Sequence, residues 1–251
     1  MKGGEPIFVD KKSDIGVLML HGFTSTPNQF KELADFFAQK GFNISAPLVA
    51  GHGTSPEDLI KTCPKDWTRS VKEAYLEFKK ISKKIIIIGN SFGGNLGFWL
   101  VKELNNEPLG IITFGAPIFL RRHKFILFRY YLYGWLKKYY HKPPRIYKID
   151  YTDMDDEITY PVIPVKSLKE FLDFMKYETM PNLAKIKVPA LVGHANIDPV
   201  VHPKSATYIY GKLGSQFKKI FWFDSNAHIV VNGKDRKALF EKAYEFIKEI
   251  M

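Results

Sequence analysis

The pentapeptide Gly89-Asn90-Ser91-Phe92-Gly93 has the G-x-S-x-G spacing typical of a serine nucleophile held in a sharp turn. Gly89 and Gly93 flank the serine closely in space, where a Cβ would crowd the turn. A free serine hydroxyl is a weak nucleophile, so Ser91 needs a base to take its proton and an acid to orient that base. A nucleotide-binding loop is disfavoured, because the glycines show neither G-x-G-x-x-G spacing nor a Gly-Lys-Ser/Thr triplet. This stretch therefore predicts nucleophilic attack on a carbonyl carbon.

The residues on both sides of Ser91 predict a strand followed by a helix. Residues 85–88 are four isoleucines without polar alternation, which is typical of a strand buried on both faces of a parallel sheet. Residues 92–104 carry apolar side chains at helical spacing. Ser91 therefore lies at a strand-to-helix turn, where the N–H groups and the positive dipole end of the helix favour a developing oxyanion.

Strands and helices alternate through most of the chain. Strands are predicted at residues 7–9, 16–20, 42–47, 85–88, 110–114, 188–193 and 218–223, and helices at 27–41, 64–82, 92–104, 203–213 and 234–250. This alternation indicates an α/β fold with a mostly parallel central sheet flanked by helices. Because ligands of such sheets bind beyond the carboxyl ends of the strands, we expect the site among residues 21–24, Ser91, 194–202 and 224–229.

A helical, aromatic and proline-punctuated segment interrupts the alternation. We predict a core made of residues 1–117 and 184–251, with a helical cap, or lid, inserted at 118–183 between late strands. Residues 121–148 contain nine lysines and arginines and no acid, interleaved with aromatic residues such as Tyr139 and Tyr140. The favoured interpretation is a lid whose aromatic face covers an acyl pocket. Weak contact with an anionic membrane or lipid interface is the second interpretation, and nucleic acid is disfavoured because no known binding motif is present.

The chain order of a serine, then an acid after a late strand, then a histidine before the last helix resembles that of the α/β-hydrolases. More narrowly, the chain resembles the small bacterial carboxylesterases related to monoacylglycerol lipases. The resemblance is carried by the peptides HGFT at residues 21–24, GHG at 51–53, DW at 66–67 and SNAH at 225–228. It spans nearly the whole chain but is thinner in the insertion. It implies an α/β-hydrolase fold and a serine esterase.

The resemblance also implies roles for single residues. Ser91 would be the nucleophile, His228 its base and Asp198 the acid of a catalytic triad. Asp198 lies several residues too early to cap the helix expected near residue 203, and the alternative acid, Asp224, more simply ends a strand. The backbone N–H groups of Phe23 and Phe92 would form the oxyanion hole. No metal or organic cofactor is required by this chemistry.

The remaining histidines are interpreted as structural. His21 lies just before the predicted oxyanion loop, where its imidazole would bond to backbone groups, and His52 would belong to a turn or a pocket wall. His194 and His202 flank the predicted acid, but packing and solvation explain them better than base catalysis. His123 and His141 belong to the basic insertion and are expected at the surface.

The expected reaction is two-step acyl transfer through an acyl-enzyme on Ser91. An aromatic lid predicts an apolar acyl group of short to medium length. The alternatives on the same triad are a monoacylglycerol lipase, a thioesterase or a hydrolase of carbon–carbon bonds. A non-catalytic binding protein of this fold is disfavoured, because it would be expected to have lost a member of the triad.

The composition of the chain limits the class of protein, its partners and its compartment. The chain has 251 residues, 45% hydrophobic and 25% charged, which is ordinary for a globular protein with a full core. The net charge of +11 favours anionic surfaces in general. The single cysteine, Cys63, excludes an intrachain disulfide, and no apolar leader or membrane span is evident, so we expect a cytoplasmic protein. The oligomeric state is not predicted.

Overall fold

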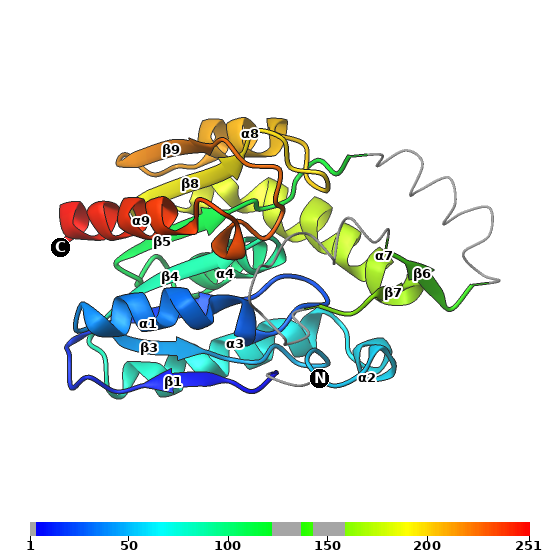
Figure 1. The fold of residues 1–251 in the computed structure, drawn as a ribbon, viewed down its shortest axis with the longest axis horizontal. Coiled ribbons are helices and arrows are strands. Elements are labelled where there is room, and N and C mark those ends of the chain that lie inside the picture. The colour runs from blue at the N-terminus through cyan, green and yellow to red at the C-terminus, as the bar shows by residue number, and fades with distance from the viewer. Residues whose placement is uncertain (1–3, 122–136, 143–158) are drawn as a thin grey trace.

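The computed structural model describes residues 4–121, 137–142 and 159–251 (Figure 1). Its main sheet has seven strands in the order β1-β3-β2-β4-β5-β8-β9. The strands are β1 (Ile7–Val9), β2 (Ile15–Leu20), β3 (Asn43–Ala46), β4 (Lys84–Asn90), β5 (Gly110–Phe114), β8 (Ala190–Ala195) and β9 (Lys218–Phe223). Only the edge strand β1 is antiparallel to its neighbour, and the other pairs are parallel. The predicted mostly parallel sheet is confirmed.

Helices cover both faces of this sheet (Figure 1). The helices that pack on it are α1 (Lys31–Gln39), α3 (Pro64–Lys79), α4 (Phe92–Glu103), α8 (Lys204–Lys212) and α9 (Arg236–Ile250). Ile85 and Ile87 belong to the core cluster that contains α3, α4 and α8, whereas Ile86 and Ile88 belong to the cluster that contains α1 and α9. Side chains alternate between the faces of a strand, so a strand covered on both sides is apolar at every position.

The start of α3 shows how local sequence sets a helix boundary. Pro64 is the first helical residue, where a missing N–H costs nothing, and the Asp66 carboxylate accepts a hydrogen bond from the backbone N–H of Cys63 at 3.0 Å. Trp67, Val71 and Tyr75 then face the core at helical spacing and are buried. The helix ends at Lys79, three residues before the predicted end. Trp67 thereby packs edge-on against Phe23 and Phe92, with ring centroids 5.9 and 5.5 Å apart.

Shorter elements complete the core and the insertion. A 3₁₀ turn (Pro27–Phe30) precedes α1, α2 (Pro56–Lys61) precedes α3, and a second 3₁₀ turn (Val230–Asn232) precedes α9. The insertion contains β6 (Tyr139–His141), β7 (Val162–Pro164), α7 (Val165–Asp173), a π-helical turn (Phe174–Thr179) and a 3₁₀ turn (Met180–Lys185). Within the described ranges, no helix is both long and apolar enough to cross a membrane.

The insertion is not purely helical. Strands β6 and β7 form an antiparallel pair, and Figure 1 shows them beside α7 at one end of the main sheet. The sequence analysis predicted no strand there, because three residues are too few for the two-residue alternation of a strand to stand out. Residues 122–136 and 143–158, which hold most of the predicted basic and aromatic lid, lie outside the described residues.

Candidate active site

Ser91 occupies the turn between β4 and α4 in a strained backbone conformation, with φ 52° and ψ −124°. Its N–H donates to the carbonyl of Phe114 at the end of β5, at 2.7 Å. A Cβ on Gly93 would lie 1.7 Å from the carbonyl oxygen of Leu20, and a Cβ on Gly89 would lie 2.5 Å from the backbone of Gly93. The turn can therefore pack against β2 only if both positions are glycine.

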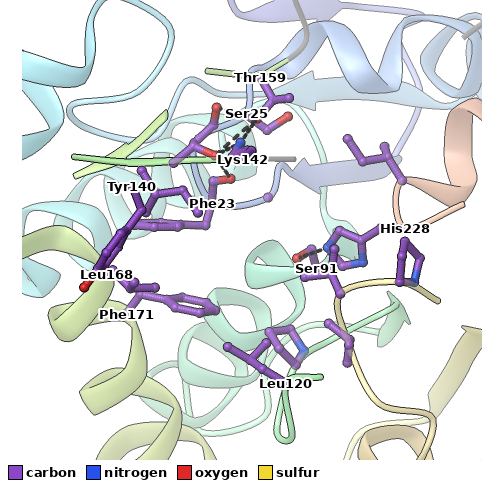
Figure 2. A pocket seen from close by; sticks show the side chains of 18 of the residues that line it. Phe23, Ser25, Ser91, Leu120, Tyr140, Lys142, Thr159, Leu168, Phe171 and His228 are labelled. Atoms are coloured by element: carbon purple, nitrogen blue, oxygen red, sulfur yellow. Dashed lines mark hydrogen bonds between the residues drawn. The ribbon is translucent and has the colours of Figure 1, made fainter. Parts of the chain in front are cut away.

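A chain of two hydrogen bonds runs from Ser91 into the core. His228 Nε2 lies 2.9 Å from Ser91 Oγ, and His228 Nδ1 lies 2.8 Å from Asp198 Oδ2. An ionised carboxylate only accepts, so Nδ1 carries the proton and Nε2 is left to accept the serine proton. Figure 2 shows the Ser91 hydroxyl facing the His228 ring at the edge of the cavity. The three residues come from the loops after β4, β8 and β9, at the carboxyl ends of parallel strands.

Asp198 is wholly buried and held by its neighbours. Burial by itself would raise the pKa of this carboxyl, but the charge and hydrogen bond of His228 lower it, as do the N–H groups of Val200 and Val201. Those N–H groups donate to Oδ1 at 2.7 and 2.8 Å. The net direction is a lowered pKa, so Asp198 is an anion at neutral pH. An anion at this place stabilises a cationic His228.

The turn after β2 approaches Ser91 closely. A Cβ on Gly22 would lie 3.3 Å from the Cβ of Ser91, so the backbone of this turn passes directly beside the serine. The Phe23 ring packs inward, stacked on Phe171 with centroids 4.9 Å apart and edge-on to Phe92 at 5.8 Å. Phe92 is the first residue of α4, where backbone N–H groups have no partner within the helix. The two N–H groups expected to bind an oxyanion therefore belong to two backbone segments that both lie close to Ser91.

A cavity of about 430 Å³ opens in front of Ser91 and His228. One wall comes from the core, including Phe23, Pro117 and Val201, and the other comes from the insertion. Among the apolar residues that the insertion contributes are Leu120, Tyr140, Ile163, Leu168 and Phe171. Figure 2 shows Tyr140, Leu168 and Phe171 on the side of the cavity opposite His228. The arrangement places a serine–histidine pair at the end of a mainly apolar chamber.

Other polar residues named in the sequence analysis have structural surroundings. His21 Nε2 accepts from the N–H of Val49 at 3.0 Å, and burial lowers the pKa of His21 to about 4 and that of His52 to about 3, so both rings are neutral. His194 Nε2 lies 4.0 Å from Asp198 Oδ2, beyond hydrogen-bond distance, and burial lowers its pKa as well. Asp224 is an exposed residue just after β9.

The sequence analysis missed several residues that line the cavity. Leu168 and Phe171 are three residues apart on α7, a spacing that indicates one face of a helix but does not tell a pocket wall from a core. Thr159 and Lys142 also line the cavity, next to Thr24 of the predicted loop, and nothing in the local sequence signals that these three residues meet. Of the predicted basic segment, only residues 121, 137, 138 and 142 carry described basic side chains, so its proposed surface role stays a prediction.

Comparison with known proteins places these features in a family. The family described as Serine aminopeptidase, S33 has a model that matches residues 11–235. The thermostable monoacylglycerol lipase of Bacillus sp. (strain H-257) is 30% identical over 247 residues, which cover 98% of this chain and 95% of that protein. The carboxylesterase of Bacillus subtilis (strain 168) is 27% identical over 247 residues, which cover 97% of this chain and 96% of that protein.

Solved structures agree with this placement. A chain from a study of the metagenome-derived lipolytic enzymes LipS and LipT superposes with a TM-score of 0.89, at 27% identity over 99% of both chains. The monoacylglycerol lipase of Paleococcus ferrophilus superposes with a TM-score of 0.80 over 98% of both chains, at 15% identity, which shows likeness of fold. From the matched range, the full-length relatives and the shared fold, we conclude that this chain belongs to the serine aminopeptidase S33 family of α/β-hydrolases.

Proposed function

We propose that this chain is a carboxylic ester hydrolase in which Ser91, His228 and Asp198 form the catalytic triad. The observation that carries the proposal is the hydrogen-bond chain from Ser91 Oγ through His228 to the buried Asp198, at 2.9 and 2.8 Å, at the end of an apolar cavity. Relatives named carboxylesterase and monoacylglycerol lipase, aligned over nearly the whole chain, support the same reaction class.

The mechanism follows from the positions of these groups. His228 Nε2 takes the proton of Ser91 as Oγ attacks the ester carbonyl, and Asp198 stabilises the imidazolium that forms. The N–H groups of Phe23 and Phe92 donate to the oxygen that becomes negative in the tetrahedral intermediate. His228 then gives its proton to the leaving alcohol, the C–O bond breaks and an acyl-enzyme remains. A water molecule, deprotonated by the same histidine, attacks the acyl carbon; the bond to Ser91 Oγ breaks, the acid leaves, and His228 returns the proton to Ser91 Oγ.

The substrate class is an ester with an apolar acyl group of short to medium length. Aromatic and aliphatic side chains from the insertion close one side of the cavity, which favours an apolar chain and limits its size. We propose that residues 118–183 act as a cap on a core made of residues 1–117 and 184–251. The 30% identity with a monoacylglycerol lipase favours one second candidate, hydrolysis of monoacylglycerols on the same triad.

A series of p-nitrophenyl esters from acetate to palmitate tests the proposal directly. We expect hydrolysis that peaks at a short or medium chain in the wild type and is lost in Ser91→Ala. Ser13→Ala, a serine in the loop before β2, should keep the wild-type rate and serves as the control. Equal rates in wild type and Ser91→Ala would refute the triad. Monobutyrin, ethyl butyrate and a butyryl thioester, compared under the same conditions, separate lipase, esterase and thioesterase activity.

A further inference from the structure

The turn that carries Phe23 has a strained residue at its centre. Ser25 N–H donates to the carbonyl of Gly22 at 3.1 Å, which closes a four-residue turn with Phe23 and Thr24 in the middle. Thr24 has φ 62°, the left-handed region that glycine usually occupies at this position of a type II turn. A β-branched residue is held there only by its surroundings, because its side chain disfavours that backbone conformation. The contacts of Thr24 therefore matter for the shape of the turn.

Two parallel hydrogen-bond chains start at the ammonium group of Lys142 and end on this turn. In the first, Lys142 Nζ donates to Thr24 Oγ1 at 2.6 Å, and Thr24 Oγ1 donates to the carbonyl of Phe23 at 2.5 Å. In the second, Lys142 Nζ donates to Thr159 Oγ1 at 2.6 Å, and Thr159 Oγ1 donates to the carbonyl of Thr24 at 2.9 Å. Figure 2 shows Lys142 with dashed hydrogen bonds at its nitrogen, between Thr159 and Phe23.

The direction of both chains depends on the donor at which they start. Lys142 Nζ has three donors as an ammonium and still two as a neutral amine, so it can donate to both hydroxyls in either state, and each hydroxyl that accepts from it turns its own hydrogen toward a backbone carbonyl. Linked donors of this kind polarise and strengthen one another. The backbone N–H of Tyr160 adds a further bond to the carbonyl of Thr24, at 2.9 Å. The carbonyls of Phe23 and Thr24 are thus both held by hydrogen bonds. Because a carbonyl belongs to a rigid peptide plane, these bonds also fix the peptide planes of the turn.

All of these donors outside the turn belong to the insertion. Lys142 directly follows β6, and Thr159 and Tyr160 lie just before β7, from which Pro161 separates them, so the antiparallel β6–β7 pair brings these residues together. Thr159 also forms a bridge with Ser25, at the far end of the turn. Thr24 is 1% exposed, so water does not compete for its bonds. Desolvation lowers the pKa of Lys142 to about 7, which means that this ammonium is unfavourable for folding at its place.

We propose that Lys142 and Thr159 are positioning residues for ester hydrolysis, because they hold the Phe23–Thr24 turn in the shape that presents the Phe23 N–H to the oxyanion. The inference rests on the proposed function and adds to it. In this role the insertion not only lines the cavity but also positions one donor of the oxyanion hole when it packs on the core. Neither side chain touches the reacting atoms in this role.

The test compares kcat and KM for wild type, Thr159→Val, Thr159→Ser and Lys142→Met on one p-nitrophenyl ester. A displaced donor weakens binding of the transition state, whereas valine and methionine nearly match the size of the side chains that they replace in the cavity lining, so we expect Thr159→Val and Lys142→Met to lower kcat by roughly ten-fold. KM should stay within about two-fold of wild type, as expected when only transition-state binding is lost. Thr159→Ser keeps the hydroxyl and should recover most of the rate.

An alkyl boronic acid gives a second readout, because its anionic tetrahedral adduct with Ser91 places a boron-bound hydroxyl oxygen in the oxyanion hole. Its affinity should fall in parallel with kcat in Thr159→Val and Lys142→Met. Ser167→Ala serves as a matched control. It removes another hydrogen bond between insertion and core, from the buried Ser167 Oγ to the carbonyl of Leu59 at 3.2 Å, and it should leave kcat and boronate affinity near wild type.

The outcomes separate this inference from the proposed function. An active wild type with unchanged kcat in both Thr159→Val and Lys142→Met would overturn the positioning role alone. That role would also be refuted if Thr159→Ser failed to recover the rate, or if Ser167→Ala lost as much activity as Thr159→Val. If the wild type hydrolysed no ester, both the proposed function and the positioning role would fall. Thermal unfolding of each variant shows whether the lost rate accompanies lost structure, and Lys142→Met is expected to unfold no more easily than wild type.

Discussion

Replacing Lys142 by methionine should stabilise the protein at neutral pH and remove part of the pH dependence of its stability. The ammonium of Lys142 lies where the insertion meets the core, and the acceptors that it has in the described part of the chain are the neutral hydroxyls of Thr24 and Thr159. Desolvation lowers its pKa from 10.5 to about 7. Methionine has a similar length and no charge, so it removes the free-energy cost of desolvating the ammonium. The Thr24 and Thr159 hydroxyls, 3.1 Å apart, can still hydrogen-bond to each other in the variant.

The sign of the pH effect follows from proton binding. Between pH 7 and 10.5 the unfolded chain keeps a proton on Lys142 that the folded chain has released, so the free energy of unfolding rises with pH across this window. The gain in unfolding free energy that comes from this released proton is complete above pH 10.5 and is lost as the pH falls through 7. Between pH 6.5 and 9.5 this linkage amounts to at most about 3 kcal/mol, and the partial exposure of Lys142 reduces it.

Urea unfolding of wild type and Lys142→Met at several pH values between 6.5 and 9.5 measures this contribution. The difference in unfolding free energy between the two proteins should be largest at pH 6.5, in favour of the variant, and should shrink steadily toward pH 9.5. Lys65→Met, which changes an exposed lysine on α3, should run parallel to wild type. Parallel curves for Lys142→Met and wild type would refute the reasoning.

Three further substitutions test the backbone and the triad. Gly93→Ala should lower the free energy of unfolding, measured in urea, by about 4 kcal/mol or more, because its Cβ would lie 1.7 Å from the carbonyl oxygen of Leu20. A loss below about 1 kcal/mol would contradict this close approach. Gly211→Ala changes a residue of α8 that has open space for the new Cβ, so the free energy of unfolding should rise by about 0.5 kcal/mol in the same assay. A fall would contradict the open surroundings of Gly211. Asp198→Asn should lower kcat by about three to four orders of magnitude with little change in KM, because an amide cannot hold the Nδ1–H tautomer of His228. A variant with near wild-type kcat would show that Asp198 is not the acid of the triad.

The sheet and the loops that carry the site could be predicted because their signals are local. The run of isoleucines at 85–88 indicated a doubly covered strand, and the structure distributes those side chains over both faces of β4. Ser91, Asp198 and His228 each follow a strand of the parallel sheet, so chain order alone brought them to one edge. The strands β6 and β7 escaped prediction, because three-residue strands have too little periodicity and form only by pairing with each other.

The limits of prediction are clearest at the cavity wall. Leu168 and Phe171 show the apolar spacing of any amphipathic helix, and only the packing of α7 against Phe23 makes them part of a pocket. The surroundings of a histidine are not visible in its local sequence either. His194 flanks the predicted acid, where a base could stand, but burial lowers its pKa and leaves the ring neutral. A residue type indicates which chemistry is available, whereas its surroundings decide whether that chemistry is used.

By itself, the sequence determined the alternating core, the sharp turn at Ser91 and the chain order of serine, acid and histidine. These depend on apolar periodicity, on glycines and on strand ends, which are properties of short stretches. Only the tertiary structure decided that Lys142 meets Thr24 and that the insertion supports the turn of Phe23. Those two residues are 118 positions apart, and their contact exists only because the folded core and the paired strands β6 and β7 offer donors and acceptors at hydrogen-bond distance.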